Sequence, residues 1–222
     1  MSLSFDPEEF HERRSVTLVS EANHRIANSL AAIAGIVRLE ASDPQRVQHL
    51  RSPAEVRNFL AEIGLRIENA AQLHRLLAES DHGSEVDLSD FLLKIAGLIL
   101  ASNAWSGRVT LDHDLTAGCA VPSNQALAIG LIVAELMTNS LKYAHPAGVG
   151  GKISLTCAPA HGGAAITVAD DGVGLPEGFD TEAAASLGFR LMRALSRQLK
   201  AKMAFDHDEL GLTVRLTTGS AR

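Results

Sequence analysis

The chain has 222 residues, 46% of them hydrophobic, which suits one medium-sized domain or two small ones with real cores. Its formal net charge of −6 argues against a broad basic surface, so we expect no nucleic-acid partner. Its two cysteines, Cys119 and Cys157, lack metal-ligand spacing, and we expect two buried thiols in a reducing compartment.

Apolar runs are short throughout the chain. The longest, 91–101 and 126–134, are the length of core helices and fall below the ~18 residues that a membrane span requires. The N-terminus lacks the basic, apolar and cleavage segments of a secretion signal. We therefore expect a cytoplasmic protein without a membrane span.

The first 82 residues have the pattern of two long helices. Asp43-Pro44 ends the first helix, because the residue before a proline avoids helical geometry. Ser52, Pro53 and Glu55 then predict a capping box at the start of the second. Apolar residues recur at spacings of three and four in both helices, at Val19, Ala22, Ile26, Leu30, Ile33 and Val37, and at Val56, Leu60, Ile63, Ile67, Ala70 and Leu77.

Such a hairpin cannot bury both of its apolar stripes alone. A symmetric four-helix bundle made from two chains would bury them and would make the protein a homodimer. Docking of the stripe on the rest of the same chain is the alternative. The helical pattern breaks at 81–84 (DHGS), so we predict a hairpin domain over 1–82 and a second domain over 85–222.

Helical and β-branched segments alternate in the second domain. The pattern predicts helices at 89–102, 123–144 and 187–199, and strands at 108–113, 152–157, 164–169, 202–207 and 212–217. This mixture indicates a two-layer α/β sandwich with helices on one face of a sheet. The predicted fold class is thus α+β, a helical hairpin followed by an α/β sandwich.

His24 lies in the segment 21–28 (EANHRIAN) and faces away from the apolar stripe of the first helix. Glu21 and Asn28 share its face, one turn before and one turn after. An exposed imidazole beside a carboxylate can be held in one tautomer and polarised for attack, and Asn28 could position a water or phosphate oxygens. A solvated polar face on an ordinary helix is the alternative.

A second polar group occupies 135–143 (ELMTNSLKY). Glu135 and Asn139 are four residues apart, so their side chains are neighbours on a helix, and the same face extends to Lys142 and Tyr143. The amide oxygen of Asn139 is a suitable ligand for Mg²⁺. Glu135 could order a metal-bound water or accept a proton, and Lys142 could neutralise phosphate charge. An amphipathic helix with a hydrated face is the alternative.

The third group is an Asp-Gly turn at 170–176 (DDGVGLP), here called the glycine turn. Asp170 ends an apolar strand and is placed to accept a bond from an exocyclic amine such as that of adenine, while Gly172 and Gly174 allow conformations closed to other residues. A plain turn is the alternative. Gly188, at the next helix start, permits close approach of phosphate, and the segment 175–187 would form a mobile lid over the nucleotide.

Taken in order, these segments resemble the sensor histidine kinases over nearly the whole chain. Residues 21–30 resemble the phosphoacceptor box of the HWE-like branch, 135–144 the N box, and 170–176 and 186–192 two glycine boxes. Ala134 stands where strict members of that branch carry histidine, and no Trp-x-Glu follows the glycine turn. The chain therefore resembles a relative of that branch.

The resemblance implies a dimerising hairpin followed by a Bergerat-type ATP-binding domain. His24 would be the phosphoacceptor, Asn139 the Mg²⁺ ligand and Asp170 the adenine contact. The phosphoryl group would pass from ATP to His24 and then to an aspartate in the receiver domain of a response regulator. Fewer than ~20 residues precede the phosphoacceptor helix, too few for a folded sensor, so we expect the input from a removed sensor or a separate protein.

Two other functions fit parts of the pattern. A histidine phosphotransferase that does not use ATP would share the architecture, but such relatives usually have eroded nucleotide motifs. An ATP-binding regulator of a sigma-factor pathway would need no histidine hairpin. The retained Asn139, Asp170, Gly172 and Gly174 favour the kinase over the first, and the setting of His24 favours it over the second.

Overall fold

The computed structural model describes residues 34, 35, 37, 52–79, 85–102, 108–145, 150–160, 163–184, 186–208 and 210–219. The chain divides into two compact units, Met1–Ala70 and Ala71–Arg222. The predicted domain boundary between 82 and 85 lies outside the described residues and stays a prediction.

Helix α3 (Pro53–Glu79) begins where the sequence predicts. The Ser52 amide donates to Glu55 Oε2 at 2.8 Å, and the Glu55 amide donates to Ser52 Oγ at 3.2 Å. These reciprocal bonds satisfy two amides that have no partner within the helix. The predicted capping box is therefore confirmed.

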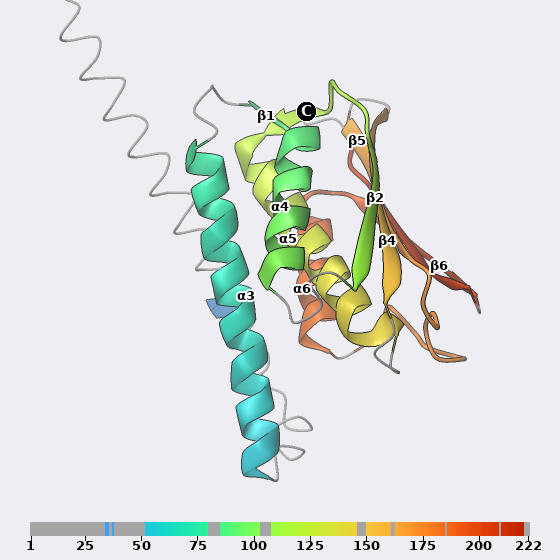
Figure 1. The fold of residues 1–222 in the computed structure, drawn as a ribbon. Helices are drawn as coiled ribbons and strands as arrows, with labels where there is room; N and C mark the ends of the chain where they lie inside the picture. Colours follow the sequence, from blue (N-terminus) through green and yellow to red (C-terminus); the bar gives the residue numbers. More distant parts are fainter. Residues whose placement is uncertain are drawn as a thin grey trace, which may run out of the picture. The chain divides into compact units, whose positions relative to one another are not determined.

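The second unit has helices on one face of a five-stranded sheet (Figure 1). The strand order is β2-β4-β5-β7-β6, with β2 and β4 parallel and the other pairs antiparallel. The strands are β2 (Val109–Leu115), β4 (Gly151–Ala160), β5 (Gly163–Asp170), β6 (Lys202–Asp208) and β7 (Gly211–Thr217). The predicted α+β fold and all five predicted strands are confirmed.

Three α-helices, α4 (Leu88–Ser102), α5 (Ser123–Asn139) and α6 (Leu187–Gln198), cover this face (Figure 1). The sequence predicts one α-helix over 123–144, but its last five residues form a π-helix, η1 (Ser140–Ala144). Two short antiparallel strands, β1 (Glu85–Asp87) and β3 (Ala120–Pro122), form a separate small sheet. Their three residues each are too few for an alternating pattern to be recognised.

The core lies between the sheet and the helices. Its large side chains with less than 2% exposure are Phe91, Leu92, Ile95, Ile129, Ile132, Met137, Leu155, Ile166, Leu187, Met192 and Leu216 among others. Cys119 and Cys157 are buried free thiols, as expected. Burial, with Cys119 beside it, raises the pKa of Cys157 to about 12, so this thiol stays protonated at neutral pH.

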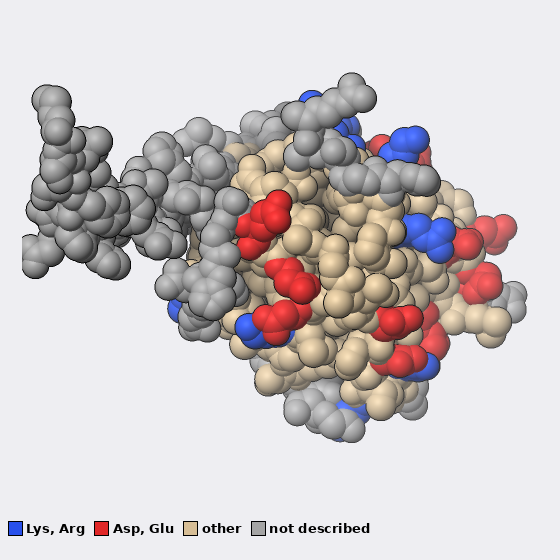
Figure 2. Space-filling model, turned by 90° about the horizontal axis from the view of Figure 1, so that it is seen from above, with Lys and Arg blue, Asp and Glu red and all other residues tan. Residues whose placement is uncertain are grey.

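The helical segment Ser123–Ala144 is long and apolar enough, taken as a whole, to cross a membrane. Its longest uninterrupted apolar run, 126–134, is shorter than a membrane span. In the folded chain 83% of its apolar window is buried, because α5 packs against α4, α6 and the sheet. The segment is thus the central helix of the domain. On the face shown in Figure 2, acidic side chains and fewer basic ones are scattered among mostly uncharged residues.

Candidate functional site

The glycine turn holds the carboxylate of Asp170 at the end of β5. The Gly172 amide donates to Asp170 Oδ1 at 3.1 Å, and the Leu212 amide of β7 donates to the same oxygen at 3.4 Å. Ser140 Oγ donates to Asp170 Oδ2 at 2.7 Å. Three donors from three segments therefore orient one half-buried carboxylate.

Close backbone packing explains the glycines of the turn. A Cβ on Gly172 would lie 2.4 Å from the carbonyl oxygen and Cβ of Ala144, at the end of η1. Gly174 has φ +67°, and a Cβ there would lie 2.5 Å from the Asp208 carbonyl oxygen. The Val173 amide also donates to the Ala144 carbonyl at 3.0 Å. The turn is thus joined to the end of the helical segment by contacts that side chains would block.

The predicted polar face of α5 begins later than the sequence indicates. Residues 126–138 are all buried, and Glu135 is only 5% exposed, because the helix is covered on every side. A hydrated face that includes Glu135, the alternative given for this segment, is therefore excluded, and the predicted role of Glu135 beside Asn139 stays a prediction. Asn139 is half-buried and Lys142 is exposed, while Tyr143 is 61% exposed. The accessible polar groups of this segment thus lie at its C-terminal end.

Ser140 belongs to the site, although no sequence motif singles it out. Its side chain is buried at 8% exposure, next to Asn139 and bonded to Asp170. A buried hydroxyl without a partner is unfavourable, so a serine on the sheet-facing side of an apolar helix requires an acceptor. The need of a buried hydroxyl for an acceptor could have pointed to Ser140. It could not identify that acceptor as Asp170, which lies 30 residues away in the sequence.

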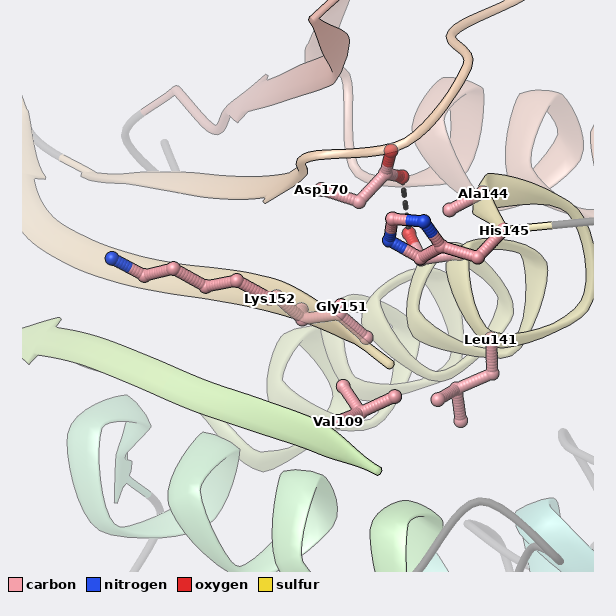
Figure 3. Close-up of a pocket in the computed structure, with 9 residues that line it drawn as sticks. Val109, Leu141, Ala144, His145, Gly151, Lys152 and Asp170 are labelled. Atoms are coloured by element: carbon pink, nitrogen blue, oxygen red, sulfur yellow. Dashed lines mark hydrogen bonds between the residues drawn. The ribbon is translucent and has the colours of Figure 1, made fainter. Parts of the chain in front are cut away.

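A hollow lies beside this carboxylate. It is lined by Val109, Ser140, Leu141, Ala144, His145, Gly151, Lys152, Ile153 and Asp170. Figure 3 shows His145 next to Asp170, the dashed hydrogen bond that the Asp170 carboxylate accepts from the Ser140 hydroxyl, and the Lys152 side chain pointing away along its strand. The Lys152 ammonium pairs instead with Asp112 at 2.8 Å. The lining is therefore largely apolar, and Asp170 is the one acidic residue among the residues that line the hollow.

Asp171, the second acid of the turn, binds to a different strand. Its Oδ1 accepts from the Lys152 amide at 2.8 Å and contacts His145 Nε2 at 2.8 Å. The backbone bond from Lys152 is the main cause that lowers the pKa of Asp171, and His145 lowers it further. The imidazole lies so close to Gly151 that a Cβ there would overlap His145 Nε2. Asp171 thus ties the turn to β4 and to the residue after η1.

The segment between the two glycine boxes is tied to α6. Arg193 Nη1 donates to the Thr181 carbonyl at 2.8 Å, and Nη2 donates to the Ala184 carbonyl at 2.7 Å. The ring of Phe179 lies 5.4 Å from that of Phe189, centroid to centroid. The predicted mobility of this segment is untested.

Gly188 is buried in the first turn of α6. Ser186 caps the helix by accepting from the Phe189 amide at 3.5 Å. The first turn of a helix presents free amides, which suits an anion such as phosphate. The position of Gly188 is compatible with its predicted role in nucleotide binding, which stays a prediction.

The predicted phosphoacceptor group, His24 with Glu21 and Asn28, lies outside the described residues. Within the described part of the chain, no group of three or more His, Cys, Asp or Glu side chains could hold a metal ion. The structure does bring together Ser140, Asp170, Gly172 and the end of η1.

Known protein families match both halves of the chain. The family described as histidine kinase matches residues 21–103, and the histidine kinase-like ATPase domain matches residues 95–218. The sensor histidine kinase PdtaS of Mycobacterium tuberculosis is 30% identical over 193 residues, which are 83% of this chain and 36% of that protein. The blue-light-activated histidine kinase 2 of Erythrobacter litoralis is 28% identical over 204 residues, 89% of this chain and 56% of that protein.

A solved structure agrees in fold over most of the chain. The blue-light activated histidine kinase of Erythrobacter litoralis EL346 superposes with a TM-score of 0.73 at 25% identity, covering 90% of this chain and 59% of that one. The chain thus spans between about a third and three fifths of these relatives. The match to the histidine kinase-like ATPase domain implies that a domain of this kind uses a nucleotide. With both family matches in sequence order and the fold in agreement, the chain belongs to the histidine kinases.

Proposed function

We propose that this chain is the catalytic core of a two-component histidine kinase. It transfers the γ-phosphoryl group of ATP to His24 and then to an aspartate in the receiver domain of a response regulator. The observation that carries the proposal is the Asp170 carboxylate, held by Ser140, Gly172 and Leu212 beside the end of η1. A fixed acceptor next to exposed polar groups suits recognition of a purine amine with the phosphates nearby.

The nucleotide contacts come from the glycine turn, η1 and α6. Asp170 accepts from the amino group of adenine, and the packing at Gly172 keeps the turn against Ala144. Gly174 provides a left-handed backbone that directs the chain into the 175–186 segment. Exposed Lys142 neutralises phosphate charge, Tyr143 covers the nucleotide, and the α6 start at Gly188 approaches the phosphates.

Mg²⁺ fits the donor set at the end of α5. This ion usually keeps several waters and takes one or two protein oxygens with the substrate phosphates, so the Asn139 amide suffices as the protein ligand. When bound, the ion would offset phosphate charge. Glu135 is buried four residues before Asn139 and acts by ordering the water or side chain next to it.

The phosphoacceptor half of the proposal rests on residues 21–28. Glu21 orients the His24 ring so that one imidazole nitrogen can attack phosphorus, and Asn28 positions phosphate oxygens. A homodimer through the helical hairpin would bring His24 to a nucleotide site, and a response regulator would receive the phosphoryl group. We place this reaction in the cytoplasm, without nucleic acid.

The test is incubation with γ-labelled ATP and Mg²⁺, with wild type beside His24→Ala. We expect label on the wild type that is lost in acid and kept in alkali, as for phosphohistidine, and none on His24→Ala. His113→Ala, which removes an exposed histidine of β2, is the matched control and should be labelled normally.

Two outcomes would contradict the proposal. Label retained in His24→Ala would place the phosphoryl group on another residue. A folded wild type that binds no ATP and takes no label would argue against a kinase, and phosphorylated receiver domains would then be tested as donors to His24.

A further inference from the structure

We propose that Ser140 is a positioning residue that makes the nucleotide site selective for a 6-amino purine over a 6-oxo purine. The inference rests on the proposed function, because it requires that Asp170 contacts the base. Its basis is the 2.7 Å bond from Ser140 Oγ to Asp170 Oδ2, made by a serine that is 8% exposed. Ser140 acts through Asp170 and need not touch the nucleotide.

The number of acceptor positions on the carboxylate supports this role. An ionised carboxylate offers about four lone-pair directions and no donor. Oδ1 already accepts from the Gly172 and Leu212 amides, and Oδ2 accepts from Ser140. About one lone-pair direction on Oδ2 is left for a ligand. The three hydrogen bonds from Gly172, Leu212 and Ser140 set where that free direction points.

A fixed acceptor of this kind discriminates between bases. It can accept from the 6-amino group of adenine, whereas the 6-oxo group of hypoxanthine or guanine presents another acceptor and is repelled. Sites built around a buried polar partner reject the mismatched analogue strongly, because that partner is left unpaired. Without the Ser140 hydroxyl, Oδ2 gains a free direction, the carboxylate can turn, and a water can bridge it to an oxo group.

Ser140 is not required to join the elements around it. The Val173 amide already bonds to the Ala144 carbonyl, and the Gly172 backbone packs on Ala144. Asp171 forms a further link through its contact with His145. Because these contacts hold the turn against η1, the Ser140 bond serves to direct Oδ2 of Asp170, while the Gly172 and Leu212 amides hold Oδ1.

The experiment measures the affinities of the full chain for ATP and for inosine triphosphate by calorimetry with Mg²⁺. The two nucleotides differ at the 6-position of the base. For Ser140→Ala we expect ATP affinity to fall by about five- to tenfold, with inosine triphosphate affinity unchanged or higher. Ser140→Thr keeps a hydroxyl and should restore most of the wild-type ratio.

Ser196→Ala is the matched control. Ser196 is also buried, at 7% exposure, but its Oγ donates to the carbonyl of Ala201, just after the C-terminal end of α6. This variant should keep the wild-type ratio of the two affinities. If Ser140→Ala does not fold, Ser140→Cys replaces it, since a thiol has similar volume and is only a weak donor.

The outcomes separate this inference from the function on which it rests. An ATP to inosine triphosphate ratio unchanged in Ser140→Ala, or an equal loss for both nucleotides, overturns the selectivity role while the kinase proposal stands. A wild type that binds neither nucleotide overturns both. A reduced ratio in Ser140→Ala, restored in Ser140→Thr and absent in Ser196→Ala, supports Ser140 as the positioning residue.

Discussion

At the scale of single residues, the two adjacent acids of the glycine turn have different surroundings. Asp170 is directed toward the candidate nucleotide site by Ser140 and two backbone amides. Asp171 is directed toward β4 and binds the Lys152 amide and His145. Successive residues at a strand end point in opposite directions, so one acid serves the site and the other serves the fold.

The lowered pKa of Asp171 predicts how stability depends on pH. A carboxyl whose folded pKa lies below its unfolded value stabilises the fold above the unfolded pKa of about 3.9, and this contribution disappears as pH falls through the folded pKa. Asp171→Asn should therefore be less stable than wild type at pH 7, by less than about 1 kcal/mol because the side chain is 52% exposed. Urea unfolding at pH 7, 5 and 3 measures the difference, which should be smallest at pH 3.

The substituted amide keeps an oxygen that can accept from Lys152, so the comparison isolates the charge. A stability difference for Asp171→Asn that stays constant down to pH 3 would mean that the charge is not responsible.

At the scale of elements, specific hydrogen bonds mark the ends of helices. α3 begins with the capping box of Ser52 and Glu55, and α5 ends in the π-helix η1 next to the site. α6 ends in a motif in which the Ala201 amide bonds to the Ser196 carbonyl and the Lys200 amide to the Arg197 carbonyl. This pattern places Lys200 at φ +51°, a left-handed position that favours glycine.

Lys200→Gly should therefore stabilise the second unit by roughly 0.5–1 kcal/mol, since glycine adopts the left-handed conformation without the Cβ penalty. The measurement is the free energy of unfolding in urea. Lys200→Ala is the control and should leave stability nearly unchanged, because alanine has the same penalty as lysine. A loss of stability in Lys200→Gly would show that the lysine side chain contributes more than its backbone strain costs.

At the scale of the whole molecule, apolar side chains on α3 stay exposed in the single chain. Val56 is 39% exposed, Leu60 59% and Ile67 43%, and all three belong to the predicted stripe of the second helix. An apolar stripe of this kind is typical of helices that pack against a partner. The proposed homodimer through the hairpin would cover it.

Leu60→Glu should weaken this dimer at least about tenfold, because a charge would replace apolar area in both copies of a symmetric interface. Sedimentation velocity over a range of concentrations measures the change, and ATP binding by the second unit should persist. Leu93→Glu on α4 is the matched control, as Leu93 is 40% exposed, and it should leave the association unchanged. An unaltered dimer in Leu60→Glu would argue that another surface joins the two chains.

Local patterns in the sequence determined most elements of this protein and its family resemblance. The alternation of helical and β-branched segments predicted α4, α5 and α6 and the five strands of the main sheet, because each of these elements extends over enough neighbouring residues to be recognised. The capping box at Ser52 depends on residues three apart and was predicted for the same reason. The glycine turn and the polar end of the mid-chain helix were recognised from neighbouring residues.

Tertiary structure alone decided what depends on residues distant in the sequence. The burial of Glu135 results from α4, α6 and the sheet surrounding α5, which a single helical wheel cannot indicate. The partners of Asp170 come from residues 140, 172 and 212, and only the order of strands brings them to one carboxylate. A sequence pattern reports the chemistry that each residue can supply, whereas the folded chain determines which acceptor each donor meets.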